Sequence, residues 1–71
     1  MEVKFKNLRG EMARAGMTQT KLAQTIGKTN ATVGYKLRGE VAWTLKEMES
    51  IQKILTSELG TTYSLDFLFK E

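Results

Sequence analysis

The stretch MTQTKLAQTIGKTNATVGYKLRG, residues 17–39, decides the fold, because it contains two short helical patterns separated by a glycine. Thr18 is a good N-cap for the first helix, expected at 19–26, since its hydroxyl can accept a hydrogen bond from an amide of the first turn. Gly27 is typical of the residue that ends a helix. A helix this short is not stable alone, so it must pack against a neighbour.

The second helix of the stretch is expected at 30–38, with Thr29 as its N-cap and Gly39 just after its last residue. Its clearly apolar residues are only Val33 and Leu37, so it contacts a core along one narrow edge. At about 100° per residue, the side chains that face away from this edge are Ala31, Thr32, Tyr35 and Arg38, and those at its flanks are Gly34 and Lys36.

Helical spacing also marks two longer patterns outside this stretch. One covers residues 7–15 and ends before Gly16. The other follows a capping box formed by Thr44 and Glu47 and runs from 45 to 57 or 58. Its expected buried side chains are Leu45, Met48, Ile51, Ile54 and Leu55.

Spacing alone leaves the two ends of the chain ambiguous. Val3 and Phe5 alternate with charged residues, which is compatible with a short leading strand. A strand is also compatible with the alternating residues of the tail, which are Tyr63, Leu65, Phe67 and Phe69. Ser64 followed by LDFLF fits an N-cap and a short helix equally well.

The composition limits the classes of function. The 71 residues make one domain and include no cysteine and no histidine, which excludes disulfides, thiolate metal sites and histidine-based catalysis. Glu47 with Glu58 or Asp66 would form a carboxylate pair without any sign of a cleft, so we expect no enzyme, metal or cofactor. The chain lacks an apolar run of ~20 residues and a signal peptide, so we expect a cytoplasmic protein without a membrane partner.

Charge is distributed unevenly along the chain. Residues 12–39 carry five basic residues and no acidic one, whereas residues 40–71 carry three basic and six acidic residues. Basic residues gathered in one segment favour a polyanionic partner, and the alternative is a chance distribution of solvated charges. The charge therefore points to a class of partner without identifying it.

Two short helices joined by a glycine-containing turn, the second with a polar outer face, form a helix-turn-helix arrangement. The major groove of DNA is about 12 Å wide and admits one helix, which must stand clear of the core. Thr32 and Tyr35 are then placed to meet base edges, while Ala31 and Gly34 allow close approach. Gly34 is explained equally well by a close contact between helices, and it costs its own helix roughly 1 kcal/mol relative to alanine.

The stretch 17–39 resembles the helix-turn-helix of the Cro/repressor-type DNA-binding family, small regulators of phages and mobile elements of Gram-positive bacteria. The segments NLRGEMARAGMTQ, TLKEMESIQKIL and SLDFLF resemble the helices that complete that domain. The most specific part is TQ-x2-LA-x2-IG followed by K-L-x-G. The resemblance implies an all-α, compact five-helix domain of the lambda-repressor-like type over residues 1–71, with the helix-turn-helix unit at about 18–39 and a short helix in the tail.

The same resemblance implies a set of DNA contacts. The residues expected to contact bases are Asn30, Ala31, Thr32 and Tyr35. The residues expected to contact the DNA backbone are Thr18, Gln19, Lys28, Thr29, Lys36 and Arg38. The sequence departs from the family at Lys21, where a capping glutamate is common, and at Gly34 and Tyr35, which replace a polar pair and leave the preferred bases undefined.

The resemblance also implies a function. It is that of a sequence-specific transcriptional regulator, a Cro-like repressor that binds a near-palindromic operator in double-stranded DNA as a weak homodimer. The dimer contact is expected in the aromatic tail, at Tyr63, Phe67 and Phe69, which would otherwise be ordinary core residues. The alternative is an antirepressor or another protein-binding module on the same scaffold, which would bind DNA poorly and without salt dependence.

Overall fold

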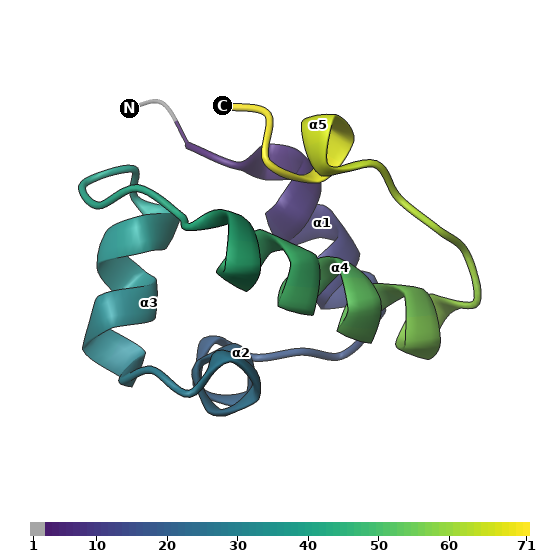
Figure 1. The fold of residues 1–71 in the computed structure, drawn as a ribbon, viewed down its shortest axis with the longest axis horizontal. Coiled ribbons are helices and arrows are strands. Elements are labelled where there is room, and N and C mark those ends of the chain that lie inside the picture. The colour runs from purple at the N-terminus through teal and green to yellow at the C-terminus, as the bar shows by residue number, and fades with distance from the viewer. Residues whose placement is uncertain (1–2) are drawn as a thin grey trace.

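Five helices follow one another along residues 3–71, the part of the chain that the computed structural model describes (Figure 1). They are α1 (Lys6–Arg14), α2 (Gln19–Ile26), α3 (Asn30–Leu37), α4 (Leu45–Leu59) and α5 (Leu65–Leu68). No strand occurs within residues 3–71, so the predicted all-α class is confirmed and the strand alternatives at the two ends do not apply.

Polar N-caps begin four of these helices, as the sequence predicts. The side chains that accept a hydrogen bond from an amide of the first turn are Thr18, Thr29, Thr44 and Ser64. At the start of α4 the capping box is complete, because Glu47 in turn accepts the N–H of Thr44 at 2.9 Å. Caps of this kind satisfy amides that have no partner inside the helix, so they fix where each helix begins.

The start of α1 is different, because its N-cap is Phe5 in a left-handed conformation with φ of 55°. This region is unfavourable for a bulky residue. The ring of Phe5 is buried and makes edge contacts with Trp43 and Phe69, at centroid distances of 6.3 and 6.4 Å. Burial of the ring offsets the cost of the backbone conformation, which turns the chain from the N-terminal segment into α1.

The helices surround one apolar core. α2 packs against α3 and α4, and α5 packs against α1 and α4, while Figure 1 shows α4 crossing the middle of the molecule and α3 at its edge. The fully buried large side chains are Leu8, Leu22, Val33, Ile51, Leu55 and Leu68.

One predicted core residue of α4 lies outside the core. Leu45 is 60% exposed, so the expectation that it belongs to the buried stripe is wrong. At about 100° per residue, Leu45 points roughly 100° away from the mean direction of Ile51 and Leu55, which are both fully buried. The stripe therefore starts one turn later, with the half-buried Met48.

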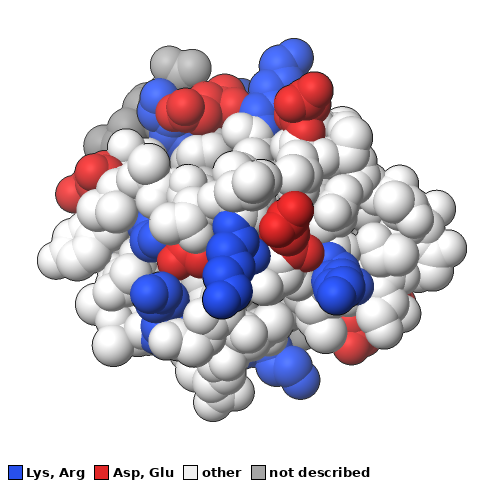
Figure 2. Space-filling model, in the orientation of Figure 1, with Lys and Arg blue, Asp and Glu red and all other residues white. Residues whose placement is uncertain are grey.

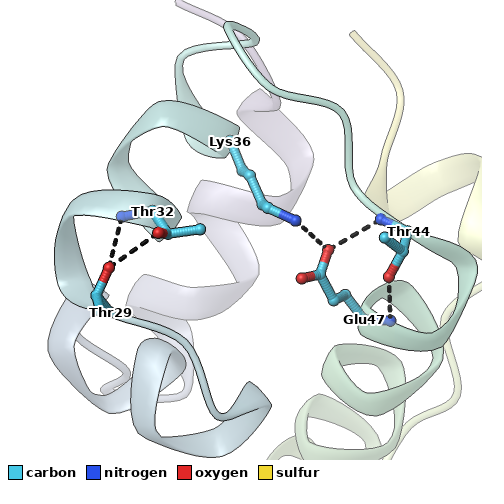
Figure 3. Close-up of polar contacts among 5 residues, drawn as sticks. All are labelled: Thr29, Thr32, Lys36, Thr44 and Glu47. Carbon is cyan, nitrogen blue, oxygen red and sulfur yellow. Dashed lines mark hydrogen bonds and ion pairs between the residues drawn. The ribbon is translucent and has the colours of Figure 1, made fainter.

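α3 gives the core only two large apolar side chains, Val33 and Leu37, and polar bridges hold its other contacts. The ammonium of Lys36 lies 2.5 Å from Oε1 of Glu47 in α4, and both side chains are only 7% exposed (Figure 3). In the same last turn of α3, Nη2 of Arg9 donates to the carbonyl of Leu37 at 2.9 Å. A cation is favourable there, because the last carbonyls of a helix lack partners and carry partial negative charge.

The Lys36–Glu47 pair makes the stability of the fold depend on pH. Burial raises the pKa of Glu47, but the hydrogen bond from Lys36 and the bonds from Thr44 outweigh it, so the pKa lies below its usual value of 4.5. A depressed pKa in the folded state means that ionised Glu47 stabilises the protein above the unfolded pKa. This contribution is lost as the pH falls through the folded pKa.

Glu47→Gln tests this bridge, because glutamine keeps an acceptor for the Thr44 N–H but leaves the buried Lys36 ammonium without a counter-charge. We expect the free energy of unfolding at neutral pH to fall by about 3 kcal/mol. The difference from wild type should shrink as the pH falls below 4.5 and through the lower folded-state pKa of Glu47, where the wild type takes up a proton. Urea unfolding over this pH range measures both effects.

The double variant Lys36→Met/Glu47→Leu is the control, since it removes both charges and leaves apolar groups of similar size. Its loss of stability should be smaller than that of Glu47→Gln alone. Equal stability of wild type and Glu47→Gln at neutral pH would contradict a structural role for the pair.

Candidate nucleic-acid interface

α2 and α3 form one unit, in which a short turn joins the two helices. Gly27 ends α2 with φ of 69°, a left-handed conformation that favours glycine. The N–H of Lys28 donates to the carbonyl of Ala23 at 2.9 Å, and Thr29 then begins α3. The turn therefore sets α3 directly against α2, with the side chain of Lys28 exposed between them.

The outward face of α3 has the phase that the sequence predicts. Tyr35 is 46% exposed, Ala31 and Asn30 are exposed, and Thr32 is half-buried. Val33 lies on the opposite side, with no exposed surface. Of the four residues predicted to contact bases, Ala31, Thr32 and Tyr35 thus lie on the side of the helix opposite Val33, and Asn30 is exposed at its N-terminal end.

Hydroxyl groups are paired at the start of α3. Oγ1 of Thr29 accepts the N–H of Thr32 at 3.1 Å and donates to Oγ1 of Thr32 at 2.9 Å (Figure 3). Because Thr32 accepts from Thr29, its own O–H remains available as a donor. The cap therefore orients a donor at the N-terminal end of the outward face.

Gln19 ties the start of α2 to the start of α3. Its Nε2 donates to the backbone carbonyl of Asn30 at 3.0 Å and to Oδ1 of Asn30 at 2.8 Å. The side-chain oxygen of Asn30 is thereby occupied, and its NH2 group is the donor left for a partner. Gln19 thus positions a residue predicted to contact bases, in addition to its own predicted contact with the DNA backbone.

Gly34 is buried beneath two side chains of this unit. A Cβ at this position would lie 3.0 Å from Nε2 of Gln19 and 3.3 Å from Nη1 of Arg38. Of the two explanations open from the sequence, the structure therefore favours close packing, with side chains as the neighbours.

Three of the five basic side chains in residues 12–39 have acidic partners from outside that segment. The partnered residues are Arg14 with Glu11 at 3.6 Å, Lys36 with Glu47 at 2.5 Å and Arg38 with Glu40 at 2.6 Å. Among residues 3–71, Lys21 and Lys28 have no acidic partner within 4.0 Å. Figure 2 shows basic and acidic side chains interspersed, without a continuous basic area on the face it displays.

The position of Lys36 corrects the expectation that it contacts the DNA backbone. Its helical position at the flank of the apolar edge is as predicted, but the flank faces α4, where Glu47 binds the ammonium. Lys36 is 5% exposed and cannot reach a phosphate in this arrangement. Arg38 and Lys28, in contrast, are exposed as expected.

The aromatic tail is divided between core and surface. Tyr63 stacks on Phe67 with 5.8 Å between ring centroids, and the hydroxyl of Tyr63 donates to Glu11 at 2.8 Å, which raises the pKa of Tyr63. Phe67 is 41% exposed. Phe69 instead packs its ring 5.5 Å from that of Trp43. Phe69 is half-buried, as Tyr63 is, and its ring also packs against Phe5. Phe67 is therefore the only exposed residue of the three predicted for the dimer contact, which stays a prediction.

Within residues 3–71 the structure contains no group of three or more acidic, histidine or cysteine side chains able to hold a metal ion. None of the helices in that range has the length and apolar character needed to cross a bilayer. A comparison of the chain with protein-family models found no matching family, and comparisons with curated proteins and with solved structures found no match. The candidate site is therefore interpreted from its own geometry.

Three residues hold the α2–α3 unit in place, and the sequence did not predict this role for any of them. Arg9 donates to the C-terminal end of α3, and Glu47 and Glu40 bind the cations of Lys36 and Arg38. The capping box identifies Glu47 only as a helix-start residue. Periodicity describes one helix at a time, so it does not show which side chains of different helices meet.

Thr29→Ala removes the N-cap of α3 and the hydroxyl that orients Thr32. We expect the free energy of unfolding to fall by about 1 kcal/mol, the usual cost of losing such a cap. Thr29→Ser keeps the hydroxyl and should lose much less. Urea unfolding followed by circular dichroism compares the two, and equal stabilities would show that the hydroxyl is not the stabilising group.

Proposed function

We propose that this chain is a sequence-specific, double-stranded DNA-binding regulator of transcription, a Cro-like repressor with a helix-turn-helix of the lambda-repressor-like type at about 18–39. The observation that carries the proposal is the division of α3 into two sides. Val33, Leu37 and Lys36 fasten one side to the rest of the protein, and the other side is accessible and rich in hydrogen-bonding groups. A helix of this form is suited to enter a major groove.

The dimensions of α3 support this function. An α-helix with its side chains is about 10–12 Å across, which the major groove of about 12 Å admits, and the 8 residues of α3 extend roughly 12 Å along the helix axis. The hydroxyl of Thr32 and the amide of Asn30 lie in its first turn, where recognition helices contact base edges. Ala31 adds a methyl group that fits against the methyl of thymine.

Contacts with the DNA backbone are proposed at the ends of the unit. Thr18 and Thr29 are the N-caps of α2 and α3, and Gln19 and Lys28 are exposed beside them. Helix N-termini favour a phosphate through their amides and partial positive charge. Because Lys21 and Lys28 are the unit's only cations without an acidic partner within residues 3–71, the electrostatic contribution is modest.

We therefore expect salt-dependent DNA binding with a shallow slope. About two phosphates neutralised per subunit correspond to a slope of about −2 in log affinity against log salt concentration. Fluorescence anisotropy with a genomic duplex over a range of salt concentrations measures the slope. The variant Lys21→Ala/Lys28→Ala should bring it close to zero, with Lys46→Ala/Lys53→Ala on α4 as the matched control.

Absence of binding by the folded wild type at low salt would contradict a DNA-binding function. That result would favour the second candidate, an antirepressor or other protein-binding module. This candidate is supported by the apolar side chains on the surface, which include Val41 at 46% exposure and Phe67 at 41%. It differs from the first in needing no contact between α3 and DNA.

We also propose that the regulator binds a near-palindromic operator as a weak homodimer. Phe67 and the half-buried Tyr63 form a stacked pair on α5 and the segment before it. In a two-fold dimer the same pair would be buried from both subunits. Such a dimer binds two half-sites about 34 Å apart, one turn of DNA.

Phe67→Ala tests this interface, because it removes exposed apolar area and leaves the buried Leu68 in place. We expect a loss of affinity of about tenfold for a full operator and little change for a half-site. Leu45→Ala, which removes a still more exposed side chain on α4, is the control. Equal affinities of Phe67→Ala and wild type for the full operator would place the dimer contact elsewhere.

A further inference from the structure

Arg38 reaches back along α3 instead of extending beyond its end. Arg38 is the C-cap of the helix, yet its Nη1 lies 3.3 Å from the position that a Cβ of Gly34 would occupy, one turn earlier. Side chains on a helix lean toward its N-terminus, which explains this direction. The guanidinium is therefore level with the middle of α3, on the outward face.

Two neighbours fix the orientation of this guanidinium. Its carbon lies 5.1 Å from the centroid of the Tyr35 ring, and Nε donates to Oε2 of Glu40 at 2.6 Å. One face of the planar group is thus against an aromatic ring, and one edge is hydrogen-bonded to a carboxylate. A guanidinium held in this way loses less side-chain entropy when it binds a ligand.

Gly34 provides the space for this arrangement. The side chains of Gln19 and Arg38 approach it from two helix ends, at 3.0 and 3.3 Å from its would-be Cβ. An alanine would displace one or both, because these distances are shorter than ordinary van der Waals contacts. The absence of a side chain in the middle of α3 therefore lets the guanidinium of Arg38 lie over this residue, beside the Gln19 amide, whose two N–H groups bind Asn30.

The Nη N–H groups of this guanidinium fit a ligand with two adjacent acceptor atoms. Both the O6 and N7 atoms of guanine and two oxygens of a phosphate have that form. The carboxylate of Glu40 distinguishes them. It neutralises the Arg38 cation and repels a phosphate, whereas an uncharged base edge accepts hydrogen bonds without that repulsion.

We propose that Tyr35, Arg38 and Glu40, above Gly34, form a preorganised reader of a guanine in the operator. The inference rests on the proposed DNA-binding function and assigns Arg38 to a base instead of the DNA backbone. Tyr35 and Glu40 are positioning residues, and Arg38 contacts the base. Recognition of guanine by arginine requires two donors in a planar fork, so lysine is not an equivalent residue.

The experiment begins with selection of bound duplexes from a random pool by the wild type. We expect a guanine at a defined position of each half-site, and its replacement by 7-deazaguanine, which lacks the N7 acceptor, should weaken wild-type binding by about tenfold. Arg38→Lys should lose roughly ten- to hundredfold affinity for the selected duplex. The 7-deazaguanine penalty should disappear in this variant.

Gly34→Ala separates recognition of guanine from stability, because a purely structural role of Gly34 would not change the base preference. Alanine is the better helix former, so the variant should melt no lower than wild type while losing preference for the selected guanine. Gly10→Ala in α1 is the matched control, because no atom lies within 4 Å of its would-be Cβ and DNA binding should be unchanged. Tyr35→Phe, which keeps the ring, should retain more affinity than Tyr35→Ala.

The outcomes separate this inference from the function on which it rests. If Arg38→Lys weakens binding to all duplexes alike and wild type shows no 7-deazaguanine penalty, the acceptors are phosphate oxygens and the guanine assignment is overturned while DNA binding stands. If Arg38→Lys binds the selected duplex as wild type does, Arg38 does not contact the guanine and the assignment is overturned as well. If the folded wild type binds no duplex, the proposed function fails and the inference fails with it.

Discussion

A helix that leaves one side exposed to solvent can pack against the core only along a narrow edge. The rest of the structure depends on this constraint. α3 contributes Val33 and Leu37, and the buried Lys36–Glu47 pair makes up for the apolar contacts that it lacks. In the capping box, Glu47 also accepts a hydrogen bond from the backbone N–H of Thr44. One carboxylate therefore sets both the start of α4 and the position of α3. Arg9 binds the last carbonyl of the same end of α3.

Ion pairs within the protein reduce the number of free positive charges at the candidate site. Basic residues of the acid-free segment 12–39 bind carboxylates in the structure, including Lys36 with Glu47 and Arg38 with Glu40. What remains on the outward face are hydroxyl, amide and guanidinium donors with fixed partners. Such a surface discriminates by the direction of its hydrogen bonds, and long-range attraction to a polyanion contributes less.

Local signals predicted the elements, and tertiary contacts decided what the sequence could not show. The caps at Thr18, Thr29 and Thr44 depend on residues three positions apart, so they can be identified from the sequence. The burial of Lys36 depends on Glu47 in another helix, and the left-handed Phe5 depends on rings more than thirty residues away. Helical phase predicted the outward face of α3, but the partners of its charged side chains came from elsewhere in the chain.

The segment that leads into α1 and the tail that follows α5 lie side by side (Figure 1). They are joined by the Lys4–Glu71 contact of 3.4 Å and by Asn7, which donates to the carbonyl of Phe67 at 2.9 Å. Contacts between residues so far apart close almost the whole chain into a loop, and loop closure costs entropy before it gains any packing. The order of folding follows from this. α2, α3 and α4 are neighbours in sequence and can associate first. We therefore expect the docking of α5 on α1 to be the late event in folding, and the terminal helix to be the part that opens first in unfolding.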